Sequence, residues 1–242
     1  YFKKKFRNVV FSQNEKNIID NKKINLISIA SYDNHHYHQI IQSLKKNKNI
    51  FVEKPLCLNE RELKKIFILL IKKKLKLNCN FVLRTLPEIL DLKNNIRRGK
   101  LGKIYYIEGD YNYGRIQKIV KGWRGKIKNY SVILGGGIHL IDLILWLTNK
   151  RVQKVIALGN RISTQNTNFK QNDIVSSLMQ MSDKSIAKIT ANFSNISKHH
   201  HLLSVYGTKG TFIKTLTKSY YIYSRDPSKK ILILKKNKKE IK

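Results

Sequence analysis

The stretch Ile50-Phe-Val-Glu-Lys-Pro55 decides how the first part of the chain folds. Its apolar residues run into a proline, which cannot donate a backbone hydrogen bond to a sheet, so they predict a buried strand that ends there. Glu53 and Lys54 would then lie at the carboxyl edge, where open parallel α/β sheets bind ligands. A lysine beside a carboxylate at that edge is a candidate proton donor or electrostatic anchor. The alternative is a surface ion pair at a strand end.

The segments on both sides predict more parallel strands. Residues 8–11 and 24–30 are strand-like, and the second run is almost continuously apolar, as expected for a strand covered on both faces. Apolar residues at helical spacing follow Asp33 and Asn34, either of which is a suitable N-cap. A strand, a helix and a strand within about thirty residues predict a βαβ unit. A covering helix over residues 60–74 and a strand over 77–84 would extend it.

A different pattern begins at Lys103. Strand-like runs, many of them alternating, cover Ile104–Tyr113, Val152–Leu158, Ile174–Met181, Ser185–Phe193, His200–Tyr206 and Tyr220–Tyr223. A helix opened by Pro87 precedes them, and a helix over 136–148 follows three glycines. The predicted fold class is therefore α/β plus α+β. A partial Rossmann domain (parallel βαβ) occupies residues 1–84, and a mostly antiparallel open-sheet domain occupies 85–242.

Composition limits the functional classes. The 242 residues carry 49 Lys and Arg against 15 Asp and Glu, a formal charge of +34, which suggests a nucleic-acid or anionic-membrane partner. The basic residues are scattered along the whole chain, however, so we expect no specific nucleic acid. No apolar run reaches the roughly 18 residues of a membrane span. Two cysteines exclude a disulfide scaffold and favour the cytoplasm.

One histidine cluster, His199-His-His201, raises the question of a metal site. His199 and His201 would share a face of a strand. No nearby carboxylate or cysteine completes a first coordination shell around them. We therefore expect no metal.

Several landmarks in order carry a resemblance to a known family. They are Ser28-Ile-Ala30, His36, Glu53-Lys-Pro55, Arg84, Trp123-Arg124 and Gly135-Gly-Gly-Ile-His-Leu-Ile-Asp142. Together they resemble the glucose–fructose oxidoreductase, inositol dehydrogenase and MocA (Gfo/Idh/MocA) family over roughly residues 8–235. The resemblance implies hydride transfer between NAD or NADP and a carbon of a sugar, sugar-nucleotide or cyclitol. It also implies a homo-oligomer built through the C-terminal sheet.

The resemblance also implies roles for single residues. Lys54 and His139 would be catalytic, with Lys54 stabilising an alkoxide and His139 acting as base or acid. The residues implied to bind cofactor are Ser31, Tyr32, His36, Glu53, Lys54, Arg84, Trp123 and Arg124. Those implied to bind the small-molecule substrate are Lys54, Tyr130, His139 and Asp142.

Three departures from the family pattern leave two hypotheses. No G-x-G-x-x-G phosphate loop occurs, and both ends of the chain look truncated, with a charged run over 235–242 where members continue into a helix. Many members carry an aspartate where this chain has Gly135, so the proton relay would rest on His139 and Lys54, with Tyr130 or Asn129 as candidates to assist. The chain is then a truncated oxidoreductase with weakened dinucleotide binding. Alternatively, it is a non-catalytic remnant that binds a sugar-nucleotide or forms oligomers.

Overall fold

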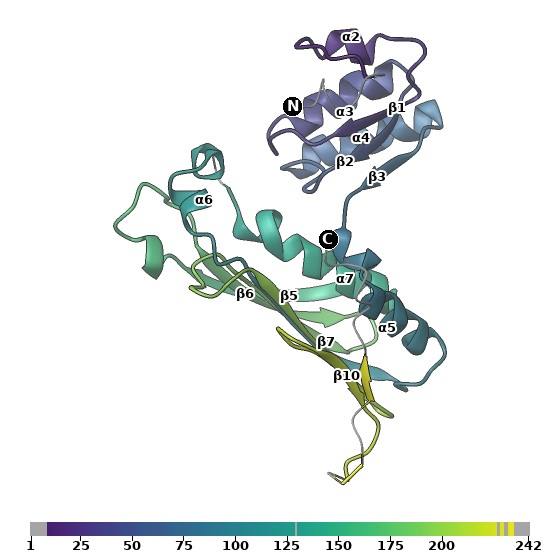
Figure 1. Cartoon of the computed structure of the whole chain (residues 1–242), viewed down its shortest axis with the longest axis vertical. Coiled ribbons are helices and arrows are strands. Elements are labelled where there is room, and N and C mark those ends of the chain that lie inside the picture. The colour runs from purple at the N-terminus through teal and green to yellow at the C-terminus, as the bar shows by residue number, and fades with distance from the viewer. Residues whose placement is uncertain (1–8, 129, 227, 230–231, 235–242) are drawn as a thin grey trace. The chain divides into compact units, whose positions relative to one another are not determined.

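The chain folds into two compact units, residues 1–80 and residues 81–242 (Figure 1). The computed structural model describes residues 9–128, 130–226, 228–229 and 232–234. Asn129 and the charged run 235–242 lie outside the described residues. Each unit is described separately below.

The first unit is a three-stranded parallel sheet with connecting helices. Its elements are α2 (Lys16–Ile19), β1 (Leu26–Ile29), α3 (His36–Lys45), β2 (Asn49–Val52), α4 (Glu60–Lys73) and β3 (Leu77–Cys79). The strands lie in the order β1-β2-β3, and both pairings are parallel. Apolar residues of β1 and β2 pack against α3 and α4 in one core that includes Ile29, Ile40, Leu44, Val52 and Ile66. The predicted parallel βαβ arrangement is confirmed.

Three local predictions in the first unit were wrong. Val9–Phe11 form no strand, and Val10 is 92% exposed, because no described strand lies beside them to pair with. Helix α3 starts at His36 after an N-cap, His35, that makes no side-chain capping bond, so neither Asp33 nor Asn34 is the cap. The strand predicted over 77–84 ends at Cys79. The next residue, Asn80, still donates its N–H to the Val52 carbonyl (2.8 Å), but β2 itself ends at Val52, so later residues have no partner strand. Residues Val82–Thr85 instead form the 3₁₀ helix η1.

The second unit contains an eight-stranded sheet. Its strands are β4 (Ile104–Asn112), β5 (Val152–Asn160), β6 (Ile174–Met181), β7 (Ile186–Asn192), β8 (His200–Gly207), β9 (Thr211–Lys214), β10 (Ser219–Ile222) and β11 (Leu232–Leu234). The order among the described strands is β11-β10-β9-β8-β4-β7-β6-β5. All pairings are antiparallel except that of β4 with β7, so the predicted mostly antiparallel sheet is confirmed. Strands β9 and β11 were not predicted.

Helices α5 (Pro87–Arg97) and α7 (Ile138–Thr148) lie along one face of this sheet (Figure 1). Alternate residues of the strands face them, such as Ile107, Ile189 and Val205, and pack against Leu140 and Leu143 of α7. The shorter helices are α6 (Gln117–Val120), η2 (Trp123–Lys126) and η4 (Ile162–Thr164). None of the helices in the described residues is long and apolar enough to cross a membrane.

Candidate active site

Glu53 and Lys54 follow directly after β2, at the carboxyl edge of the parallel sheet. The Glu53 N–H donates to the Ile29 carbonyl (2.9 Å), which continues the parallel pairing one residue past the strand. The side-chain amide of Asn80, just after β3, donates to Glu53 Oε1 at 2.6 Å. Lys54 is half-buried and precedes Pro55. The predicted placement of Glu53 and Lys54 at a strand end is therefore what the structure shows.

His36 holds two loops of this edge together. Its ring is fully buried, with Nδ1 2.7 Å from the Pro55 carbonyl and Nε2 3.2 Å from the Ser31 carbonyl. Both partners are acceptors, so the ring donates to one of them when neutral and to both when protonated. Both ring nitrogens of His36 already have backbone partners. A contact between His36 and a cofactor therefore stays a prediction.

A cleft along β1 contains part of the predicted cofactor segment. Its volume is about 170 Å³, it is open to solvent, and its walls come from β1, α2 and α3 together with Ala30 and Ser31. The Ser31 hydroxyl lies 2.7 Å from Gln39 Oε1, and Tyr32 beyond it is half exposed. This volume is smaller than that of a typical whole-ligand pocket, so the cleft has room for only a fragment of a dinucleotide.

In the second unit, α7 begins with an irregular turn at the three glycines. Ile133–Gly137 is wound as a π-helix, η3, which continues directly into α7. Such single π turns occur often at functional sites. A Cβ on Gly136 would lie 2.5 Å from a Tyr111 ring carbon and 2.8 Å from one of Phe193, so only glycine lets these rings approach the helix.

His139 lies in the first turn of α7 and is fixed between two aromatic rings. It is only 6% exposed. The Tyr111 ring stacks on it at 5.8 Å and 9°, and the Phe81 ring meets it edge-on at 6.2 Å and 89°. Burial raises the pKa of Tyr111, so this phenol stays protonated. The sequence analysis assigned no role to Tyr111 or Phe81. The alternation of the strand that contains Tyr111 was the one sequence signal that pointed to an inward-facing side chain there.

Arg84 and Asp142 form a bidentate ion pair. Arg84 Nε lies 2.7 Å from Asp142 Oδ2, and Nη2 lies 2.5 Å from Oδ1. The guanidinium carbon also lies 5.7 Å from the ring centres of Phe81 and Trp146. The structure thus brings together one predicted cofactor residue and one predicted substrate residue, with each holding the other.

Trp123, Arg124 and Tyr130 come from the segment between β4 and α7. The Arg124 guanidinium lies over the Trp123 ring at 4.3 Å, a cation–π contact on η2. Burial raises the pKa of Tyr111, and the positive charge of Arg124 acts in the opposite direction and lowers it. Tyr130 is buried, with its ring edge-on to Phe169 and Phe193.

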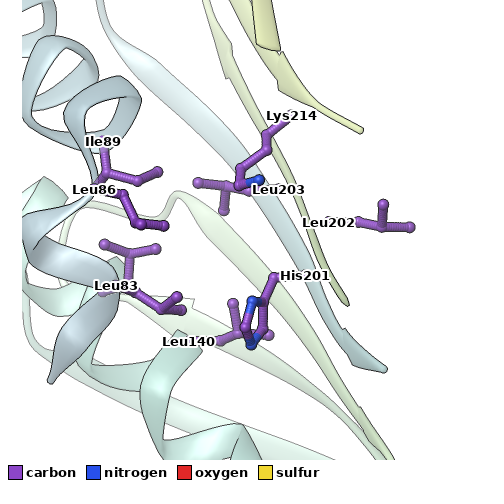
Figure 2. A pocket seen from close by; sticks show the side chains of 9 residues that line it. Leu83, Leu86, Ile89, Leu140, His201, Leu202, Leu203 and Lys214 are labelled. Atoms are coloured by element: carbon purple, nitrogen blue, oxygen red, sulfur yellow. The ribbon is translucent and has the colours of Figure 1, made fainter. Parts of the chain in front are cut away.

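His199 and His201 lie against Tyr111 on the neighbouring strand. The cross-strand register pairs Tyr111 with His201, and the ring centres are 4.8 Å apart. Burial lowers the pKa of His201 from 6.5 to about 3, and the nearby His199 and His139 add to this effect. His201 also lines a small cavity whose other walls include Leu83 of η1, Ile89 of α5 and Leu140 of α7 (Figure 2). Among the described residues, no group of three or more His, Cys, Asp or Glu is arranged to hold a metal.

Comparison with known proteins agrees with this architecture. The chain is 21% identical over 198 residues to an uncharacterized oxidoreductase of Streptococcus pneumoniae, covering 80% of this chain and 53% of that protein. It is 24% identical over 212 residues to the uncharacterized oxidoreductase YhhX of Escherichia coli, covering 86% and 58%. The chain therefore spans little more than half the length of these relatives.

A solved structure has the same fold. It is scyllo-inositol dehydrogenase from Lactobacillus casei, solved with NAD(H) and scyllo-inositol, with a TM-score of 0.74 and 23% identity. The similarity covers 85% of this chain and 61% of that one.

Two family matches cover most of the sequence. Residues 2–81 match the NAD-binding Rossmann fold of the oxidoreductase family, and residues 89–213 match the GFO/IDH/MocA C-terminal domain. The predicted cofactor class, NAD or NADP, is that of the family. The predicted family and both parts of its fold are confirmed: the chain belongs to the Gfo/Idh/MocA oxidoreductases.

Proposed function

We propose that the protein transfers hydride between NAD or NADP and a hydroxyl-bearing carbon of a sugar, sugar-nucleotide or cyclitol. One observation carries the proposal. Lys54 lies at the edge of the parallel sheet in one family domain, and His139 lies in the first turn of α7 in the other, and both side chains have the chemistry that the reaction requires. A scyllo-inositol dehydrogenase of the same fold, solved with NAD(H) and a cyclitol, supports the substrate class.

Lys54 supplies positive charge. A hydroxyl that loses hydride passes through a state with negative charge on oxygen, and an ammonium group close to that oxygen stabilises it. Lys54 is half-buried, so its charge is less screened by water than that of an exposed lysine. The backbone before the lysine is paired with β1, because the Glu53 N–H donates to the Ile29 carbonyl. The Glu53 side chain accepts a hydrogen bond from Asn80.

His139 takes the proton. Oxidation of a hydroxyl carbon releases one proton together with the hydride, and imidazole titrates in the range where it can accept that proton near neutral pH. Tyr111 and Phe81 fix its ring plane, so the ring nitrogens keep constant directions. The Arg84–Asp142 pair anchors α7 to η1 one turn further along. Tyr130 and Asp142 remain candidate substrate contacts.

The bound nicotinamide cofactor supplies or accepts the hydride. The cleft along β1 has room for a fragment of a dinucleotide, and Ser31 lines it. Tyr32, Glu53 and Lys54 lie outside the walls of this cleft and are further candidates for cofactor contacts. Trp123 and Arg124 are further candidates, because a guanidinium offers planar donors to a phosphate.

Free cysteines Cys57 and Cys79 fit a reducing compartment, the cytoplasm.

A second candidate is a non-catalytic sugar-nucleotide-binding or oligomerisation module. The observation in its favour is that no G-x-G-x-x-G occurs in these 242 residues. Backbone groups of that loop carry much of the pyrophosphate binding in Rossmann domains.

Fluorescence titration with NADH and NADPH separates the two candidates. It is made on the 242-residue chain and on a chain extended upstream to the start of the gene. Binding by either chain supports the oxidoreductase, and Lys54→Ala and His139→Gln should then abolish turnover. Binding by neither overturns the proposed hydride transfer and leaves the binding module.

We also propose that the protein self-associates through the open face of the large sheet. Edge strand β5 exposes Ile156 and Leu158, which are 69% and 79% accessible. The register places Ile156 opposite Leu178, and Ile186 of β7 opposite Gln180 on the same face, so these apolar side chains form one patch. Contiguous exposed apolar surface of this kind marks association sites.

A further inference from the structure

An exposed arginine lies at the end of the ring stack that begins at His139. The ring of Tyr113, one residue beyond β4, stacks on that of Tyr111, with the centres 6.0 Å apart and the planes at 21°. The guanidinium carbon of Arg115 lies over the Tyr113 ring, 5.4 Å from its centre. Because Tyr111 also stacks on His139, two tyrosine rings separate the candidate base from the guanidinium.

His199 lies beside the same tyrosine as the arginine. Its ring centre is 5.3 Å from that of Tyr113 and 5.1 Å from that of Tyr111. Its Nδ1 lies 3.2 Å from the backbone carbonyl oxygen of Asn112. Burial lowers the pKa of His199, and the positive charge of Arg115 lowers it further, so the guanidinium is close enough to act on the imidazole.

The charge of Arg115 is not balanced by a carboxylate. Two other cations of this unit are paired: Arg84 with Asp142, and Lys214 with Glu88 at 3.5 Å. Arg115 forms no ion pair within the part of the chain that the structure describes. An exposed guanidinium without a carboxylate partner, beside an imidazole, favours the binding of an anion.

We propose that Arg115 and His199 bind a phosphate group of the substrate. The guanidinium offers planar donors to the phosphate oxygens, and the protonated imidazole supplies a further N–H. The two tyrosine rings place this group away from His139, so the phosphate is a substituent that the hydride transfer leaves intact. The proposal rests on the proposed function and narrows its substrate to a sugar phosphate, a cyclitol phosphate or a sugar-nucleotide.

The first test is an NMR pH titration of His199 in the full chain, with and without inorganic phosphate. The variant His199→Gln identifies the signal. Bound phosphate favours the imidazolium, so it should raise the pKa of His199. In Arg115→Gln the pKa should already be higher without phosphate, because a positive neighbour is gone, and phosphate should raise it less.

The controls separate this site from the general attraction of a basic chain for anions. His38, exposed on α3, should respond to phosphate less than His199 does. The other ionisable groups around His199 are the same in the native chain and in Arg115→Gln; they are Tyr111, Tyr113, His200 and His201. An unchanged pKa of His199 in phosphate, or an equal rise for His38, overturns the proposal.

The second test is isothermal titration calorimetry with myo-inositol 1-phosphate and myo-inositol at one ionic strength. The native chain should bind the phosphate ester about tenfold more tightly or better, and Arg115→Gln should remove about tenfold of affinity, as expected for one charge-assisted contact. Arg115→Lys should restore part of it, because it keeps the charge but not the planar donors. The matched control is Arg98→Gln, at the exposed end of α5. Equal affinities for the two ligands, or an equal loss in the control, contradict the phosphate site.

The cofactor also carries phosphates, for which Arg124 on η2 is the candidate. Weaker NADH binding by Arg115→Gln, with unchanged binding of myo-inositol 1-phosphate, would assign Arg115 to the cofactor and overturn the substrate contact. Phosphate binding at Arg115 without NADH binding by any form of the protein keeps the phosphate site and removes the hydride transfer. NADH binding without any effect of phosphate on His199 keeps the proposed function and removes the phosphate site.

Discussion

Arg84 and Asp142 illustrate how the environment of a single residue sets its role. The Asp142 carboxylate is 11% exposed, and both of its oxygens accept hydrogen bonds from one guanidinium. Arg84 is also packed against two aromatic rings, so it is held in one orientation. A lysine could not reproduce this planar two-bond contact.

Removal of this guanidinium should destabilise the second unit. Arg84→Ala leaves a nearly buried carboxylate without its partner, and we expect it to lower the free energy of unfolding by about 2 kcal/mol. Urea unfolding measures the change, with Arg97→Ala, an exposed arginine at the end of α5, as the control. Equal midpoints for the two variants would show that the pair contributes nothing.

His201 should make stability depend on pH. Its pKa is about 3 when folded against 6.5 ordinarily, so the unfolded chain binds its proton first as the pH falls. The stabilising contribution is complete above about pH 6.5 and is lost as the pH falls toward about 3.

The variant His201→Gln checks this dependence. Unfolding free energies at pH 5 and pH 7 should differ less in it than in the native protein, by roughly 1 to 2 kcal/mol. His38→Gln, an exposed histidine of α3, is the control and should keep the native pH dependence. A native slope in His201→Gln would show that His201 titrates normally.

At the scale of elements, the two long helices of the first unit start in different ways. Helix α4 has a side-chain cap: Asn59 Oδ1 accepts from the Glu62 N–H at 3.0 Å, and Glu62 Oε2 accepts from the Leu58 N–H at 3.0 Å. Helix α3 has no such bond at its N-cap, His35. Its start is instead fixed by the buried ring of His36, which contacts two backbone carbonyls.

Loss of the cap should therefore matter only in α4. Asn59→Ala should lower the free energy of unfolding by about 1 kcal/mol, whereas Asn34→Ala before α3 should change it by less than about 0.5 kcal/mol. Thermal or urea unfolding of both variants gives the comparison. A larger decrease in the free energy of unfolding of Asn34→Ala would indicate that Asn34 does cap α3.

At the scale of the whole molecule, the sheet of the second unit has two different faces. One face is covered by α5 and α7, and the other carries the apolar patch of Ile156, Leu158, Leu178 and Ile186. The first two of these residues lie on β5, an edge strand among the described residues. An edge strand with exposed apolar side chains favours pairing with another chain.

Charge on this patch should prevent self-association. We expect the native chain to elute as an oligomer in size-exclusion chromatography with light scattering, and Ile156→Glu/Leu158→Glu to elute as a monomer. Ile71→Glu, on the exposed side of α4, is the control and should keep the native mass. A monomeric native chain, or an unchanged mass in the double variant, contradicts association through this face.

The local sequence determined most of the helices and strands and the order in which the family motifs occur along the chain. Apolar runs and alternation located most strands, with Ile174–Met181 correct to the residue, because burial on one or both faces imposes these periods directly. The strand end at Glu53-Lys-Pro55 and the helix carrying His139 also follow from short-range signals.

Only the tertiary structure decided which of those residues meet. Strand β3 stops where its neighbour stops, and strand register pairs Tyr111 with His201, residues 90 positions apart in the chain. Arg84 holds Asp142, and the Tyr130 hydroxyl fills the place of a side chain at Gly135. Such contacts depend on how distant segments pack, and a pattern confined to neighbouring residues does not contain that information.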